Sequence, residues 1–263
     1  MHTVSVGPVT LSIYSLSSAI ALAVGLVLVW RVARLRRLDS DLALDAALAG
    51  LLLGLIAGRL ETVVTNLDYF RERPSLLLSL GQGGLGVRTL TVVGMSTYVL
   101  VVYQQSPRWR QYLSALTPAL AASAAIMWAG ALFWGGFAGV PWSGPVALAL
   151  PDRYGVVVTR LPLQAVVAAA HAAFAVASAT FLHRSLPPGL CLSFWGASTS
   201  ALAAFLSNFR AEQPLLADVL PRPLVADLAL AAAWLVFGLL VARRQTAATT
   251  PDETGPQPGG APL

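Results

Sequence analysis

Charge is scarce in this chain of 263 residues, and lysine does not occur at all. Only 11% of the residues are charged, whereas soluble domains average about 25%. Hydrophobic residues make up 56% of the chain, so the composition indicates a protein that is solvated by lipid. All 17 basic residues are arginines, which stay protonated when buried and bind carboxylate or phosphate through paired hydrogen bonds. A GC-rich genome would produce the same bias.

Other absences narrow the function further. Cys191 is the only cysteine, which excludes an internal disulfide and gives no sign of a metal site. The net charge of +5 comes from arginines in separate loops, so we expect no nucleic-acid partner. No basic region precedes the first apolar run, Leu11–Trp30, which is also too long for a cleaved signal peptide. We interpret that run as a retained membrane span, and we predict neither a metal nor a cofactor.

Long apolar runs are abundant, and a helix needs about 20 of these residues to cross a bilayer. Seven stretches qualify: Leu11–Trp30, Leu42–Gly58, Leu85–Tyr103, Leu113–Trp134, Pro162–Leu182, Leu190–Leu206 and Leu224–Val241. The sequence therefore predicts an all-α integral membrane protein with seven transmembrane helices. No internal repeat is evident, which disfavours a transporter built from paired halves.

Arginines in the short loops set the predicted orientation. They follow spans one, three, five and seven, and they include Arg31, Arg34, Arg36, Arg37, Arg108, Arg110, Arg184, Arg243 and Arg244. These loops fall on one side, which we assign to the cytoplasm, so the N-terminus is predicted outside and the C-terminus inside. Two short β runs flank a turn at Pro151–Gly155, which predicts a small external hairpin between spans four and five. We expect residues 1–244 to form the membrane domain and residues 245–263, rich in Thr, Pro and Gly, to form a disordered cytoplasmic tail.

Six weak motifs occur in one order along the chain. They are Ser5–Tyr14, Gly54–Leu60, Leu80–Arg88, the proline at Pro118, Arg160–Gln164 and Trp195–Gly196. No single one is specific, but their order and intervals resemble the bacterial prolipoprotein diacylglyceryl transferase family over Ser5 to about Val241. Seven spans with an external N-terminus is also the topology that this resemblance implies.

The chain departs from the family pattern at several charged positions. The family's histidine falls on Arg88, and its other polar motif positions fall on Trp128, Ala131, Gly136, Val166, Val167, Thr199 and Ala203. Arginine cannot act as a general base near neutral pH, so Arg88 does not inherit the histidine's task of accepting a proton. The motif positions that survive are Tyr14, Arg59, Gly83, Gly84, Arg160, Pro162 and Gln164.

The resemblance implies transfer of diacylglyceryl from phosphatidylglycerol to the lipobox cysteine thiol of a prolipoprotein, in the bacterial plasma membrane. Its partners would be phosphatidylglycerol or another anionic lipid and the signal peptide of a prolipoprotein. We assign Arg88 and Tyr14 to catalysis, and we assign Arg59, Gly83, Gly84, Arg160 and Gln164 to the lipid headgroup. Arg88 has no acidic neighbour within one helical turn, so we expect lipid phosphate to be its partner.

Structural roles remain open for each of these residues. Arg59 could extend to the interface with Glu61 or Asp68 as its partner. Tyr14 could be an ordinary interfacial anchor, the glycines could serve helix packing, and Arg160 and Gln164 could cap span five. The whole chain could be an inactive paralogue that binds anionic lipid or a lipoprotein precursor. An intramembrane hydrolase built on Ser198 is disfavoured, because no histidine follows in a later span.

Overall fold

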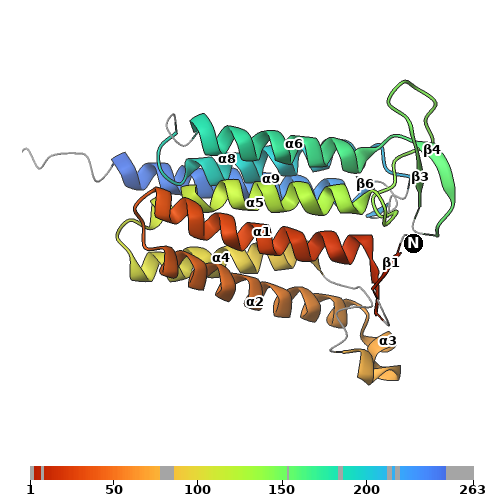
Figure 1. The fold of residues 1–263 in the computed structure, drawn as a ribbon, viewed down its shortest axis with the longest axis horizontal. Coiled ribbons are helices and arrows are strands. Elements are labelled where there is room, and N and C mark those ends of the chain that lie inside the picture. The colour runs from red at the N-terminus through yellow and green to blue at the C-terminus, as the bar shows by residue number, and fades with distance from the viewer. Residues whose placement is uncertain are drawn as a thin grey trace, which may run out of the picture.

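The computed structural model is a bundle of long helices that lie side by side (Figure 1). It describes residues 3–6, 9–77, 86–152, 154–182, 186–211, 215–216 and 220–246. The long helices of this described part are α1 (Ile13–Leu35), α2 (Ser40–Thr65), α4 (Val87–Gln105), α5 (Trp109–Ala131), α6 (Leu163–Ala177), α8 (Leu190–Ser207) and α9 (Arg222–Thr246). A π-helical turn, η2 (Ser178–Leu182), continues α6. The predicted tail from residue 247 onward lies outside the described residues.

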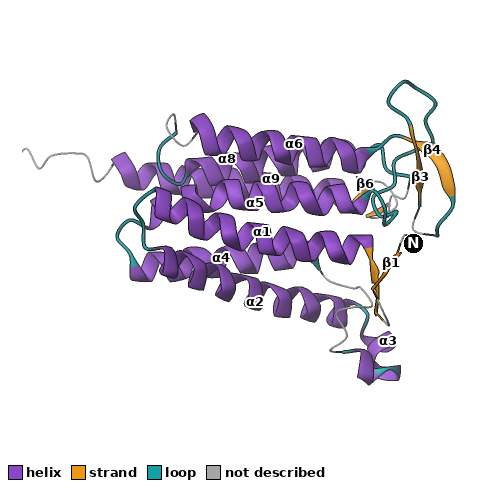
Figure 2. Ribbon diagram, in the orientation of Figure 1, coloured by secondary structure: helices purple, strands orange, loops and turns teal. Residues whose placement is uncertain are grey.

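The short elements gather at one end of the bundle, opposite the loops that join α1 to α2 and α4 to α5 (Figure 2). They comprise the helix α3 (Leu67–Glu72), the 3-10 turn η1 (Pro74–Leu76) and three two-stranded antiparallel sheets. The strand pairs are β1 (Thr3–Val6) with β2 (Val9–Ser12), β3 (Leu148–Pro151) with β4 (Val157–Arg160), and β5 (Leu215–Leu216) with β6 (Leu220–Pro221). We call this the strand end of the bundle.

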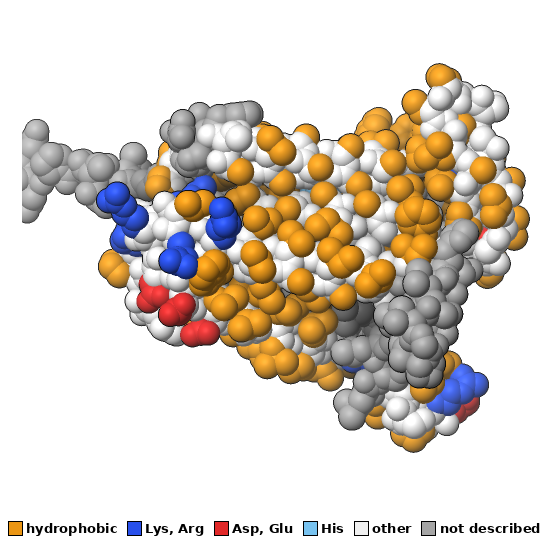
Figure 3. All heavy atoms as spheres, in the orientation of Figure 1, with side chains coloured by type: hydrophobic (Ala, Val, Ile, Leu, Met, Phe, Trp, Pro, Cys, Tyr) orange, Lys and Arg blue, Asp and Glu red, His pale blue; other side chains and the backbone are white. Residues whose placement is uncertain are grey.

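Among the described residues, six helices are long and apolar enough to cross a membrane: α1, α2, α5, α6 with the start of η2, α8 and α9. Their outer surfaces carry exposed aliphatic side chains, such as Val27, Leu52 and Leu239. Figure 3 shows hydrophobic side chains along the sides of the bundle, with charged side chains gathered mainly at the end opposite the strands and near α3. This surface is that of a multi-pass, all-α membrane protein, since lipid chains and not water satisfy such a surface.

The third predicted span corresponds to α4, which is not among the six. Arg88 at one end of this helix and Gln104 and Gln105 at the other make it more polar than its neighbours. It nevertheless lies along α2 within the bundle (Figure 1). Seven spans and their orientation therefore stay predictions.

Helices extend beyond the apolar runs that predicted them. α1 continues past Trp30 through Arg31 and Arg34, and the guanidinium carbon of Arg34 lies 4.7 Å from the centre of the Trp30 ring. The interpretation of these two arginines as loop residues was wrong. Apolar runs report the hydrocarbon thickness, whereas backbone hydrogen bonding continues into the headgroup region. For the same reason Arg59 lies inside α2. At α4, in contrast, the helix begins at Val87, later than the predicted run, so Arg88 is its second residue.

Glycines allow α2 and α4 to pack with their backbones in contact. Gly50 and Gly54 of α2 face Gly94 of α4, and Gly58 faces Gly86. A Cβ atom placed on Gly50 would lie 2.6 Å from the Gly94 carbonyl oxygen, and one on Gly54 would lie 2.7 Å from the Leu90 carbonyl oxygen. Small residues spaced four apart permit such close approach of membrane helices. We call Gly50, Gly54, Gly58 and Gly94 the glycine ladder.

The interior of the bundle centres on α5, which packs against α1, α6 and α8. Half of the residues in the apolar stretch of α5 are buried, compared with 11% of those in α1. Small residues such as Ala115, Ala119 and Ala121 are almost fully buried, because they let neighbouring helices approach closely. This helix therefore fixes the relative positions of the elements at the strand end.

Candidate functional site

Arg88 forms an ion pair with a residue that is 139 positions away in the sequence. Its Nε and Nη2 atoms donate hydrogen bonds to the same oxygen, Oδ1 of Asp227 on α9, at 3.0 and 2.8 Å. The Arg88 side chain is 47% exposed, whereas that of Asp227 is 10% exposed. Arg88 has no acidic neighbour within one helical turn, but an acid on a helix at the far end of the sequence pairs with it. Lipid phosphate as its partner stays a prediction.

Asp227 also lines a pocket at the strand end. The other lining residues are Trp128, Phe137, Leu163, Val167, Ala203, Leu206, Ser207 and Arg210, which come from α5, α6, α8 and the segments that follow α5 and α8. The wall is mainly apolar, and Asp227 and Arg210 supply its charges. Its volume is about 20 Å³, which holds about one water molecule, so a larger ligand enters only if the walls move apart.

Phe137 forms one wall of the pocket in an unusual backbone conformation. It lies two residues after Gly135, and both residues have positive φ angles, 59° for Phe137 and 83° for Gly135. A bulky residue rarely adopts this conformation, and it persists where surrounding contacts hold it. The centres of the Phe137 and Trp128 rings are 4.8 Å apart, in an edge-to-face arrangement. The guanidinium carbon of Arg210 lies 4.1 Å from the centre of the Phe137 ring.

Three predicted site residues hold the chain segment that contains Phe137, residues 134–139, which we call the 134–139 turn. Tyr14 stacks on Trp134 with ring centres 4.9 Å apart. Nε2 of Gln164 donates a hydrogen bond to the Gly136 carbonyl oxygen at 2.6 Å, and Nη1 of Arg160 donates one to Gly139 at 3.3 Å. Tyr14, Arg160 and Gln164 therefore lie together and position a pocket wall.

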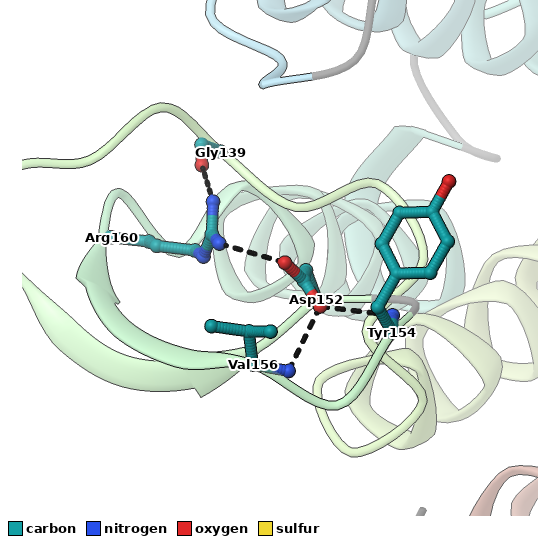
Figure 4. A network of polar contacts seen from close by, with 5 residues as sticks. All are labelled: Gly139, Asp152, Tyr154, Val156 and Arg160. Atoms are coloured by element: carbon teal, nitrogen blue, oxygen red, sulfur yellow. Dashed lines mark hydrogen bonds and ion pairs between the residues drawn. The ribbon is translucent and has the colours of Figure 1, made fainter.

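Arg160 also organises the β3–β4 hairpin (Figure 4). Its Nη2 lies 3.2 Å from Oδ2 of Asp152, while Oδ1 of Asp152 accepts hydrogen bonds from the amides of Tyr154 and Val156. Both charged side chains are mostly buried, at 7% exposed for Arg160 and 17% for Asp152. The hairpin itself agrees with the two β runs in the sequence, and its location outside the membrane stays a prediction. Its β4 strand leads directly to α6, so the network ties the hairpin to the bundle.

Gln164 is 1% exposed and lies at the second position of α6. Its Oε1 atom is buried, and no hydrogen-bond donor among the described residues reaches it. Its Nε2 atom is the one that bonds Gly136, so this side chain bridges to the preceding segment. It does not cap its own helix through a side-chain hydrogen bond within the described structure.

Arg59 holds the chain that follows α2. Its Nε donates to the Leu77 carbonyl oxygen at 3.0 Å, and Nη2 donates to Leu76. The guanidinium carbon lies 5.1 Å from the centre of the Phe70 ring on α3. Arg59 is buried, so it secures η1 and α3 against α2 just before the predicted glycine run. Gly83 and Gly84 of that run lie outside the described residues.

His171 has the packed role that its apolar helix predicts. Its Nδ1 atom accepts a hydrogen bond from the Trp195 indole at 3.2 Å, and the side chain is buried. This contact lies within the bundle, on α6 and α8. His183 lies outside the described residues.

Sequence reasoning missed Asp227 and Arg210 as members of the site. Asp227 carried a usable signal, because an acid near the end of an apolar run is costly unless it has a partner. Its pairing with Arg88 could not be read locally, since the two residues meet only when α4 and α9 are assembled. Arg210 carried no distinguishing pattern in its loop.

The fold and this site define a multi-pass membrane protein with an arginine–aspartate pair beside a mainly apolar pocket at the ends of its helices. Comparison with known proteins identifies the kind of protein. The family model of prolipoprotein diacylglyceryl transferases matches residues 2–243. The chain therefore belongs to the prolipoprotein diacylglyceryl transferase family, as the resemblance of its motifs predicts.

Curated relatives carry the name phosphatidylglycerol–prolipoprotein diacylglyceryl transferase. That of Fusobacterium nucleatum is 37% identical over 82 residues, which is 31% of this chain and 28% of the relative. That of Parasynechococcus marenigrum is 30% identical over 120 residues, 46% of this chain and 43% of the relative. That of Synechococcus elongatus is 30% identical over 152 residues, 57% of this chain and 52% of the relative. The matched regions thus span from about a quarter to about half the length of these relatives.

Proposed function

We propose that this protein transfers the diacylglyceryl group of phosphatidylglycerol to the lipobox cysteine thiol of a prolipoprotein. The thiol loses its proton to solvent, a carbon–sulfur bond forms at the diacylglyceryl carbon, and the bond from that carbon to the phosphate oxygen breaks. Glycerol phosphate leaves with the electron pair of the broken bond. The observation that carries this proposal is a half-exposed guanidinium, Arg88, beside a mainly apolar pocket at the helix ends in a chain of this family. An arginine there suits a phosphate, since its planar fork forms two parallel hydrogen bonds.

Residue roles follow from the contacts of each side chain. Arg88 binds the phosphate and stabilises charge as it develops on the leaving group. In place of catalysis for Tyr14 and headgroup binding for Arg160 and Gln164, we propose a positioning role for these three residues, because they hold the 134–139 turn that carries Phe137 of the pocket. Arg59 positions the chain that leads to Gly83 and Gly84, and the amides of these two glycines contact the headgroup.

The proposed membrane arrangement extends the fold by one span. α4 is the seventh, because it lies alongside α2 and its 19 residues are about the number that a helix needs to cross a bilayer. With the N-terminus outside, the strand end and its β3–β4 hairpin lie on the external face of a bacterial plasma membrane. The loops rich in arginine lie in the cytoplasm, as the positive-inside rule requires. Phosphatidylglycerol then reaches the site from the outer leaflet.

The direct test incubates the purified full chain with phosphatidylglycerol and a lipobox peptide. Mass spectrometry should show a peptide heavier by one diacylglyceryl group, with glycerol phosphate released in equal amount. Substitution Arg88→Gln should reduce the rate at least about a hundredfold, the usual loss when one donor to transition-state charge is removed. Arg71→Gln is the matched control, because Arg71 lies at the same end on α3 and is 70% exposed. No product from the wild type, alongside an active relative, would refute the proposed activity.

A further inference from the structure

The Arg88–Asp227 pair bridges two helices that otherwise share little contact. α4 packs along α2, and α9 packs along α8. Within the described structure, α4 and α9 are not among the helix pairs with extensive contact. The ion pair is therefore the main contact between α4 and α9 within the described structure.

The geometry of the pair is that of an anion bound to the edge of an arginine. Nε and Nη2 of Arg88, which form the two-donor edge that suits phosphate, both point to one carboxylate oxygen. The arginine is half-exposed, while the aspartate lies on the pocket side. Because the Arg88 side chain is half-exposed, a second anion can reach it and compete with Asp227 for the same edge.

We propose that Asp227 is a placeholder for the lipid phosphate, and that a phospholipid phosphodiester displaces it from Arg88. This inference rests on the proposed function, because it concerns the same headgroup. The exchange keeps the guanidinium paired with an anion throughout, which avoids the large cost of leaving a charge unpaired in a low-dielectric site. The displaced carboxylate remains at the pocket wall, which Arg210 also lines, so its charge stays near a cation.

If the phosphate displaces Asp227, removing the Asp227 charge should increase the affinity for lipid, whereas removing one partner of a purely structural ion pair should not. Asp227→Asn removes the competing charge at nearly constant size, so phosphatidylglycerol should bind more tightly, by about fivefold. Loss of a merely structural partner would weaken or leave unchanged the binding of lipid. Asp68→Asn is the matched control, because it removes the same charge from a side chain that is 98% exposed on α3.

Binding is measured with the purified full chain in neutral dodecyl maltoside micelles, using fluorescent phosphatidylglycerol and anisotropy. Diacylglycerol, which lacks the phosphate, serves as the reference lipid, and glycerol phosphate tests for a soluble ligand. Elution as a single species and an unchanged unfolding temperature establish that each variant is folded. Asp227→Ser replaces Asp227→Asn if the amide variant does not fold.

Tighter binding of phosphatidylglycerol by Asp227→Asn, absent in the double variant Arg88→Gln with Asp227→Asn, would support the exchange. Equal or weaker binding by the folded Asp227→Asn variant would overturn it, as would the same gain for diacylglycerol. A gain for glycerol phosphate as large as that for the lipid would overturn the assignment to a phospholipid. The transferase assay is separate: tighter binding without any product in the wild type refutes the proposed function and leaves the exchange standing.

Discussion

The glycine ladder between α2 and α4 gives the sharpest prediction of stability. In Gly50→Ala the new methyl would lie 2.6 Å from the Gly94 carbonyl oxygen, and in Gly54→Ala it would lie 2.7 Å from that of Leu90. Carbon–oxygen contacts normally begin near 3.3 Å, so α2 and α4 must separate by about 0.6 to 0.7 Å. Because both obstructing atoms belong to the backbone, no rotation of a side chain relieves the clash.

The magnitude follows from two opposing effects. Overpacking of this kind costs about 1 to 3 kcal/mol, while replacing glycine by alanine in a helix gains at most about 1 kcal/mol. Each single variant should therefore lose about 1 kcal/mol of stability. One outward displacement of α4 relieves both clashes, so the double variant should lose less than the sum of the single variants.

The assay is reversible unfolding of the purified protein in mixed micelles with increasing denaturing detergent. Gly25→Ala is the matched control, since its methyl would meet only the Ser123 side chain, whose Oγ lies 2.4 Å away. That hydroxyl can rotate away, at the cost of its hydrogen bond to the Ala21 carbonyl oxygen. A smaller loss is expected for it than for Gly50→Ala. Losses that add fully in the double variant, or a double variant as stable as the wild type, would refute the assigned packing of α2 on α4.

Substitutions at three further positions separate structural from chemical roles. Asp152→Asn should keep the hydrogen bonds from the amides of Tyr154 and Val156 but lose the ion pair with Arg160. Asp152→Ala should lose the hydrogen bonds as well as the ion pair, so limited proteolysis should cleave the hairpin faster in Asp152→Ala than in Asp152→Asn. His171→Phe should lose about 1 kcal/mol with the Trp195 hydrogen bond while transferase activity is retained, and a loss of activity in folded protein would instead assign it the proton transfer. Tyr14→Phe should keep the ring stacked on Trp134 and retain activity, whereas Tyr14→Leu should reduce kcat. An equal loss of kcat in both variants would show that the hydroxyl matters.

The sequence predicted the long helices well, because apolar runs of bilayer length have few alternatives in lipid. Their ends were less predictable, as Arg31 and Arg34 on α1 illustrate, since polar residues at the interface continue a helix as readily as they end it. α4 shows the converse. It forms a full helix beside α2, yet Arg88 and its terminal glutamines make it too polar to count among the six candidate spans.

The sequence motifs singled out some residues that meet at the strand end, but they missed Asp227 and Arg210 and did not indicate the contacts. The motifs singled out Arg88, Arg160 and Gln164, and all three lie at the strand end. Their partners are Asp227, Asp152 and the backbone of the 134–139 turn. Such partners depend on how distant helices and a hairpin assemble, which no local spacing encodes. Arg59 likewise bonds carbonyl oxygens of the chain after its helix, a type of partner that carries no sequence signature.

Backbone contact along the glycine ladder has a consequence for how this bundle can move. Two helices whose main chains are in direct contact move as one rigid body, because sliding or tilting one of them drives its carbonyl oxygens into the other. If the distance between α4 and α9 increases, α2 must therefore move together with α4. The hinge of this motion lies where α2 and α4 contact α1 and α5. Spin labels on the outer faces of α2 and α9 would then report the same displacement as labels on α4 and α9.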